Sequence, residues 1–313
     1  MEGLYNARPR RTMVFFTDQL LNALILGGIY ALIAVGYTMV YGIIKLVNFA
    51  HGEVYMCGAF FCIVLLANTP LPFWACLIFS MAGCAALGYL MDRFAYRSVR
   101  ESPRLAALIT AVGLSLFLQN LAMLIWGSEP RPFPSHPFQA VLSLAGGRLK
   151  VPWKFLFIWA ASLGALLLVD VLVQRTRTGK AMRACALDKA AASLMGIPVD
   201  SIIRRTFMLG SALAALAGVC YSLYIGSQVS FRMGVYPGVM AFSAAVLGGI
   251  GHVRGAFLGG LVMGCVEVAA RAWVCPALGI SGGYSTAFAF ALLIGVITTR
   301  PAGLLGRPEA QRA

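Results

Sequence analysis

Long, nearly uninterrupted apolar runs are the feature of this sequence that most limits its fold. Only helices and closed barrels satisfy the backbone polar groups inside a bilayer. Barrel strands alternate apolar and polar residues, and these runs do not. The sequence therefore predicts an all-α, polytopic membrane bundle of eight to ten membrane segments, forming one domain over residues 1–313. The candidate segments lie near residues 14–36, 52–67, 73–91, 105–126, 153–173, 207–226, 237–250, 255–272 and 284–299.

Composition agrees with a membrane protein and argues against a nucleic-acid-binding one. Hydrophobic residues make up 60% of the chain and charged residues 12%, against about 25% charged in soluble domains. The net charge of +14 would suggest nucleic acid in a soluble protein. Here the basic residues lie between the apolar runs, which is the pattern of membrane topology. The lipid bilayer is thus the expected partner, and nucleic acid is not.

The basic residues predict an orientation, because cytoplasmic loops are enriched in lysine and arginine. Loops 92–104 and 174–206 are rich in them and should be cytoplasmic, whereas loop 127–152 should face outward. The C-terminal segment should also lie inside. Counting backward puts the N-terminus outside, although Arg8, Arg10 and Arg11 favour the inside. Two crossings within 14–51, or one crossing with a re-entrant piece, would each change that count.

Glycine and other small residues recur at spacings of four within the apolar runs, as in Gly260/Gly264, Gly255/Gly259 and Ala214/Gly218. That spacing places them on one helix face, where they allow close helix–helix packing. No nucleotide-binding loop is present, because Gly179-Lys180 lacks the glycine five positions earlier that a phosphate-binding turn requires. No catalytic or metal-binding pattern is apparent either, so we expect neither enzyme activity nor a cofactor.

Polar residues inside the apolar regions are candidates for a gate or pore, since ionisable groups in membranes are usually functional. Asn48, His51 and Glu53 interrupt one long apolar region, and Gln119-Asn120 lie within another. Alternatively, residues 48–53 form a surface loop in which Asn48 or Gly52 caps the next helix. Glu267 and Arg271 are spaced to pair across one helical turn, and a structural pair is favoured over a substrate site.

Loop 174–206 carries the strongest local signal for a cytoplasmic docking element. Its centre, from Ala184 to Ile197, is predicted to be one helix that Gly196 and Pro198 terminate. Its small residues would let a partner approach closely, and its leucines would fill pockets in that partner. The alternative is a solvated basic loop that only enforces topology. The candidate coupling residues are Ala184, Leu187, Asp188, Ala191, Leu194 and Gly196.

Several of these motifs, in order along the chain, resemble the LivH-type permeases of high-affinity branched-chain amino-acid ABC importers. The resemblance covers nearly the whole chain, and segment 128–152 resembles that family least. It rests on residues 27–32, 36–43, 48–53, 183–186 with Asp188, 196–197, 244–251 and 301–308.

The resemblance implies a multi-pass protein of the bacterial inner membrane that transports leucine, isoleucine or valine. It implies a LivM-type second permease, two cytoplasmic ATPases that hydrolyse the ATP, and a periplasmic binding protein. It also implies that residues 184–197 are the coupling helix. Permeases for urea or short amides are closely similar and remain an alternative. A secondary amino-acid transporter is a further one, with only Glu53 and Glu267 as candidate intramembrane acids.

Overall fold

The computed structural model describes residues 7–100, 102–134, 138, 140–144, 149–226 and 229–306. Eight helices in the described part are long and apolar enough to cross a membrane, and a ninth, Val235–Gly248, is shorter. The predicted all-α membrane bundle is therefore confirmed. The elements are α2 (Ala7–Ile44), α3 (His51–Asn68), α4 (Phe73–Leu90), η1 (Met91–Tyr96), α5 (Arg97–Val99), α6 (Arg104–Trp126), β1 (Val141–Leu144), β2 (Leu149–Pro152), α7 (Trp153–Arg175), α8 (Arg177–Leu187), α9 (Lys189–Leu194), α10 (Val199–Ile225), α11 (Val235–Gly248), α12 (Val253–Ala269), η2 (Ala270–Val274), α13 (Cys275–Ala277), η3 (Gly282–Tyr284) and α14 (Ser285–Thr299).

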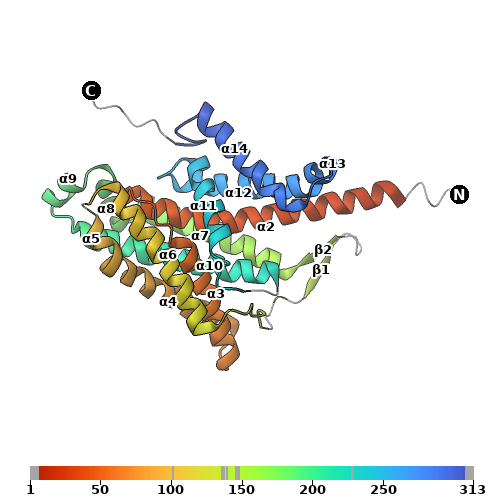
Figure 1. The fold of residues 1–313 in the computed structure, drawn as a ribbon, viewed down its shortest axis with the longest axis horizontal. Helices are drawn as coiled ribbons and strands as arrows, with labels where there is room; N and C mark the ends of the chain where they lie inside the picture. The colour runs from red at the N-terminus through yellow and green to blue at the C-terminus, as the bar shows by residue number, and fades with distance from the viewer. Residues whose placement is uncertain are drawn as a thin grey trace.

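Helix α2 forms the axis of the bundle (Figure 1). It runs unbroken for 38 residues, or about 57 Å at the helical rise per residue. Its side chains from Ile25 to Val35 are almost completely buried. Two crossings within 14–51 are therefore excluded, because residues up to Ile44 form one helix. Only the alternative with a chain that folds back after a single crossing agrees with this structure.

Small residues let the central helices touch, as their spacing predicted. A Cβ on Gly260 would overlap the backbone of Ala31, and one on Gly264 would overlap the backbone of Gly27. Helices α2 and α12 therefore cross with their backbones in contact. Lipid gives no hydrophobic drive for helices to associate, so such close packing is a main source of stability in a membrane bundle.

The outer helices present apolar side chains outward. Leu124 of α6 is 80% exposed, and Leu168 of α7 and Ile294 of α14 are exposed by more than half. A soluble protein rarely leaves so extended an apolar surface uncovered. These faces are thus suited to contact lipid or another membrane subunit.

Two predicted loops contain more regular structure than expected. Residues 92–104 were predicted to be a loop, but η1 and α5 continue α4 as far as Val99. The apolar run ends near Leu90, yet the buried Asp92 stays within the helix because Arg100 neutralises it in a salt bridge. Residues 127–152 include the antiparallel hairpin β1–β2, in which Val141 pairs with Pro152.

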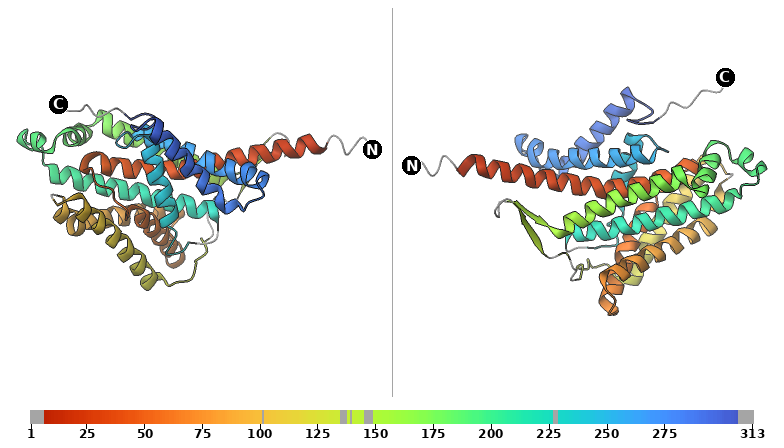
Figure 2. Two further views of the ribbon diagram at one scale, coloured as in Figure 1. Left: turned by 45° about the horizontal axis from the view of Figure 1, so that its top comes forward. Right: turned by 180° about the vertical axis from the view of Figure 1, so that it is seen from behind.

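The bundle has two distinct ends. Helices α8 and α9 lie at one end, while the β1–β2 hairpin and the N-terminal end of α2 lie at the other (Figures 1 and 2). If 174–206 is cytoplasmic, the start of α2 is on the outer side. Arg8, Arg10 and Arg11 would then lie on the outer side, against the usual enrichment of basic residues in cytoplasmic segments. The structure does not describe the side chains of these three arginines.

The sidedness can be tested by labelling single introduced cysteines. Ser193 is exposed on α9, and Glu129 is exposed near the opposite end. In intact cells, a membrane-impermeant maleimide should label Glu129→Cys and leave Ser193→Cys unlabelled until the membrane is permeabilised. The unaltered chain provides the background, since seven of its eight cysteines are buried. Ready labelling of Ser193→Cys in intact cells would reverse the orientation.

Candidate functional site

The polar break between α2 and α3 is a fold-back inside the bundle. Helix α2 ends at Ile44, and Lys45 takes a left-handed conformation with φ 61°. The chain then returns along α2, so that α3 begins beside Gly36. A Cβ on Gly36 would come within 2.6 Å of His51 Nε2. Gly36 precedes the end of α2 by about 12 Å along the helix, so α3 starts well inside the bundle.

Asn48 and His51, two of the predicted gate residues, are buried in contacts within the protein. Asn48 is buried and accepts a hydrogen bond of 2.6 Å from the Tyr96 hydroxyl. His51 is buried against the ring of Tyr37, with ring centroids 4.6 Å apart. The alternative of a capped surface loop is wrong, because residues 48–53 are largely buried and Ala50, at the N-cap of α3, makes no side-chain cap hydrogen bond.

Glu53 has the most unusual environment of the predicted gate residues. Its side chain is 1% exposed, on the first turn of α3. Its Oε1 accepts hydrogen bonds from Gln119 Nε2 at 2.8 Å and from Ser115 Oγ at 3.1 Å, both on α6. Its Oε2 is buried without a hydrogen-bond partner. The structure thus joins Glu53 and Gln119, which lie 66 positions apart in sequence.

A cavity of about 160 Å³ adjoins this carboxylate, between α6 and the first turns of α11. The glycines at the start of α11 allow α11 to pack closely against α3, because a Cβ on Gly238 would lie only 3.1 Å from the Cα of Gly52. Most of the wall is apolar, and Glu53, Ser115 and Gln119 supply much of its polarity. The cavity is lined by Tyr37, Phe49, Glu53, Val112, Ser115, Leu116, Gln119, Gly234, Val235, Gly238 and Val239.

Sequence reasoning missed Ser115 and overvalued Asn120. Ser115 precedes Gln119 by four residues, and that spacing puts both on one helix face. Asn120 is exposed and donates to the Leu116 carbonyl of its own helix at 2.8 Å. It is not among the residues that line the cavity. The helical spacing was the signal that could have found Ser115.

Glu267 and Arg271 form the predicted pair, with Arg271 Nη2 2.5 Å from Glu267 Oε1. The Tyr30 hydroxyl on α2 donates to the other carboxylate oxygen at 2.8 Å. Both oxygens of this 1%-exposed acid are therefore satisfied within the protein. This arrangement agrees with the structural interpretation of the pair.

The predicted single helix from Ala184 to Ile197 is wrong, because the chain breaks at Asp188. Helix α8 ends at Leu187, and α9 begins at Lys189. Asp188 is extended, with φ −155°, and its Oδ1 accepts from the amides of Ala190 at 2.8 Å and Ala191 at 3.0 Å. An aspartate that caps a helix in this way favours a new N-terminus over a continuous helix.

The element α8–α9 exposes apolar side chains at the end of the bundle. Leu187, Leu194 and Met195 are 87%, 89% and 83% exposed. Ala191 and Gly196 are exposed too, and Gly196 has the left-handed φ of 78° that ends α9. Ala184, in contrast, is half-buried within α8. The exposed set forms an apolar patch of a kind that marks interaction surfaces.

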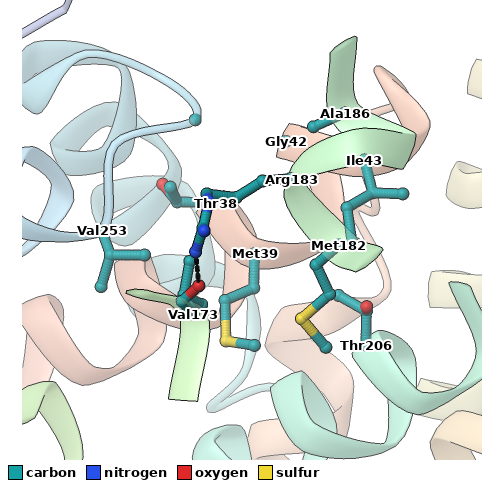
Figure 3. Close-up of a pocket in the computed structure, with 11 residues that line it drawn as sticks. Thr38, Met39, Gly42, Ile43, Val173, Met182, Arg183, Ala186, Thr206 and Val253 are labelled. Carbon is teal, nitrogen blue, oxygen red and sulfur yellow. Dashed lines mark hydrogen bonds between the residues drawn. The ribbon is translucent and has the colours of Figure 1, made fainter. Parts of the chain in front are cut away.

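Helix α8 is held against the bundle by close packing at Gly179 and by the half-buried Arg183. A Cβ on Gly179 would overlap the carbonyl groups at Leu172 and Val173, near the end of α7. Arg183 donates to the Val173 carbonyl across a pocket of about 80 Å³ (Figure 3). Met39 and Met182 also line this pocket, and methionine adapts to changes in packing.

A hydrogen bond links α9 to the start of the fold-back. Lys189 Nζ donates to the carbonyl of Ile44, the last residue of α2, at 3.3 Å. Helix C-termini leave carbonyls that such cations can satisfy. Burial, aided by the nearby Arg100 and Lys45 cations, lowers the pKa of Lys189 below its ordinary value. The contact joins the exposed α8–α9 element to the turn that leads to Glu53.

Comparison with known proteins identifies the family. Residues 19–297 match the profile of the branched-chain amino acid transport system / permease component family. The chain belongs to this permease family. LivH of Escherichia coli (strain K12), a high-affinity branched-chain amino acid transport system permease protein, is 40% identical over 96% of this chain and 98% of its own length. BraD of Pseudomonas aeruginosa, which carries the same description, is 41% identical over 95% and 98%.

A solved structure shares the fold of this permease. It is that of a metal-chelate type ABC transporter in an inward-facing conformation, with a TM-score of 0.52. It is 17% identical, and the match covers 93% of this chain and 90% of that one. With its relatives and its eight apolar helices, the chain is a multi-pass permease of the inner membrane.

Proposed function

We propose that this permease moves leucine, isoleucine or valine inward across the membrane as part of an ATP-driven importer. It would work with a LivM-type second permease, two cytoplasmic ATPase subunits and a periplasmic binding protein. The observation that carries the proposal is the nearly full-length match to permeases of that description. Permeases of this kind do not hydrolyse ATP, so the energy must enter through a contact with another subunit.

The α8–α9 element is the best candidate for that contact. Its exposed Leu187, Leu194 and Met195 supply apolar anchors of the kind that fill pockets in a partner. Lys189 ties α9 to the end of α2, and the pocket beneath α8 leaves space for α8 to shift. A displacement of α9 would thus be transmitted to the turn before α3 and, through that turn, to the Glu53 cavity.

The Glu53 cavity is the best candidate for part of the transport path. A broken helix that begins inside the membrane commonly marks a binding site in transporters. Here two such helices, α3 and the short α11, begin side by side, with Gly52 close to Gly234 and Gly238. Of the predicted gate residues, Glu53 and Gln119 line this cavity.

The proposed function is tested by uptake into proteoliposomes that contain the assembled transporter. Labelled leucine should accumulate only with ATP and the binding protein, and excess isoleucine or valine should reduce its accumulation. Urea and acetamide serve as competitors for the alternative substrate class and should have no effect. Uptake of labelled urea instead of leucine, or uptake driven by an ion gradient without ATP, would refute the proposal.

A further inference from the structure

Glu53 lacks a countercharge. In the described part of the chain, no lysine, arginine or histidine nitrogen lies within ion-pair distance of it. Gln119 and Ser115 are neutral, and both donate their hydrogen bonds to Oε1. A buried carboxylate without a cation is costly inside a membrane. It must either carry a proton or meet a cation that the protein itself does not supply.

The free oxygen of Glu53 lies at the start of α11. A Cβ on Gly234 would overlap the Gly52 carbonyl oxygen and come within 2.7 Å of Oε2, so only glycine at this position lets α11 pack directly against Glu53. Val235 and Val239 follow on the face of α11 that lines the cavity, and Val112 and Leu116 of α6 line it as well. The site therefore combines one unsatisfied acidic oxygen with aliphatic walls.

The chemistry of this site fits one class of ligand. The acidic oxygen suits a compact cation with several N–H donors, such as a primary ammonium. The aliphatic walls suit a branched hydrocarbon side chain. The N-terminus of α11 also carries the positive end of a helix dipole, which favours a carboxylate nearby. An aliphatic amino acid in its zwitterionic form has all three groups.

We infer that Glu53 binds the α-ammonium group of an amino-acid substrate during its passage, while Val112, Leu116, Val235 and Val239 hold its side chain. This inference rests on the proposed function and adds the group that recognises the substrate. In this role Glu53 acts as an anion, and the substrate supplies the missing cation. The competing interpretation is that Glu53 carries a proton and serves only as a neutral hydrogen-bonding group.

Glu53→Gln separates the two interpretations, because glutamine matches a protonated glutamate in shape but has no charge. In the assembled transporter, leucine uptake should fall at least tenfold, as expected when a charge-assisted hydrogen bond of about 1.5–3 kcal/mol is lost. Stimulation of ATP hydrolysis by the loaded binding protein should stay within twofold of the unaltered transporter. Thr110→Val is the matched control on α6, because the Thr110 hydroxyl bonds only within its own helix.

A second variant keeps the test informative if Glu53→Gln does not assemble. Gln119 Nε2 already lies 2.8 Å from Glu53 Oε1, so Gln119→Lys brings a tethered ammonium to the same carboxylate. It should preserve assembly and abolish leucine uptake, whereas the neutral Gln119→Met should retain measurable uptake.

The inference is overturned by uptake within twofold of normal in Glu53→Gln or in Gln119→Lys. It is also overturned if Glu53→Gln loses uptake and stimulated ATP hydrolysis in parallel, since Glu53 would then act in coupling. Failure of the proposed function gives a different result, because the unaltered transporter would itself take up no leucine.

Discussion

Ala191→Glu should leave the permease in the membrane and abolish transport. Ala191 is exposed on α9, in the same patch as Leu187 and Leu194, which are 87% and 89% exposed. If a partner covers this patch, the new carboxylate would be buried in an apolar contact without a hydrogen-bonding partner. Burying such a charge is strongly unfavourable, so the ATPase subunits should dissociate.

The measurements are copurification of the ATPase subunits and uptake of labelled leucine. We expect both to fall at least tenfold, while the amount of permease in the membrane stays normal. Ala191→Ser is the matched control, because it keeps a small neutral side chain at the same place and should behave almost normally. If Ala191→Glu retains its ATPases and transports normally, α8–α9 is not the coupling element.

Gly264→Val should prevent stable folding of the bundle. A side chain at Gly264 on α12 would overlap the backbone of Gly27 on α2. The two helices would have to separate, and the packing between them has no replacement in lipid. Overpacking of this kind costs about 1–3 kcal/mol of stability and occasionally more. Because rigid backbone faces the new side chain here, we expect a loss of stability at the upper end of this range.

Gly113→Val provides the comparison, because a Cβ at Gly113 on α6 meets no atom within 4 Å. Both variants make the same chemical change in an apolar helix. The yield of folded protein in mild detergent and its midpoint of thermal aggregation should fall sharply for Gly264→Val only. An equal effect at both positions would show that helix propensity matters more than the α2–α12 contact.

Some features of the site could be expected from sequence, and others depended on distant partners. Glu53 stood out because an acidic residue in an apolar region is rare. Asn48 and His51 stood out as polar residues in the same region, but only the structure places them in contact with Tyr96 and Tyr37. Ser115 could have been found from its spacing of four to Gln119, whereas the start of α11 was missed because nothing near it in the sequence indicates that it adjoins Glu53.

The coupling element shows how a local signal can be misinterpreted. Alanines between Ala184 and Ala192 favour helix on either side of Asp188, so one continuous helix was predicted. Asp188 can also cap a helix, and its hydrogen bonds to Ala190 and Ala191 divide the segment in two. Helix propensity and capping compete at such a position, and only the surrounding contacts decide between them.

The sequence by itself determined the class of this protein, its approximate membrane segments and its family, because these follow from apolar length, charge bias and ordered motifs. The tertiary structure decided that α2 is one helix, that α3 starts inside the bundle, and that Glu53 contacts α6 and the start of α11 beside a cavity. Apolar periodicity shows that a segment belongs in the membrane, but it does not specify which helix packs against which. Those contacts arise from the fit of small residues such as Gly52 and Gly234, which lie far apart in the chain and meet only once it is folded.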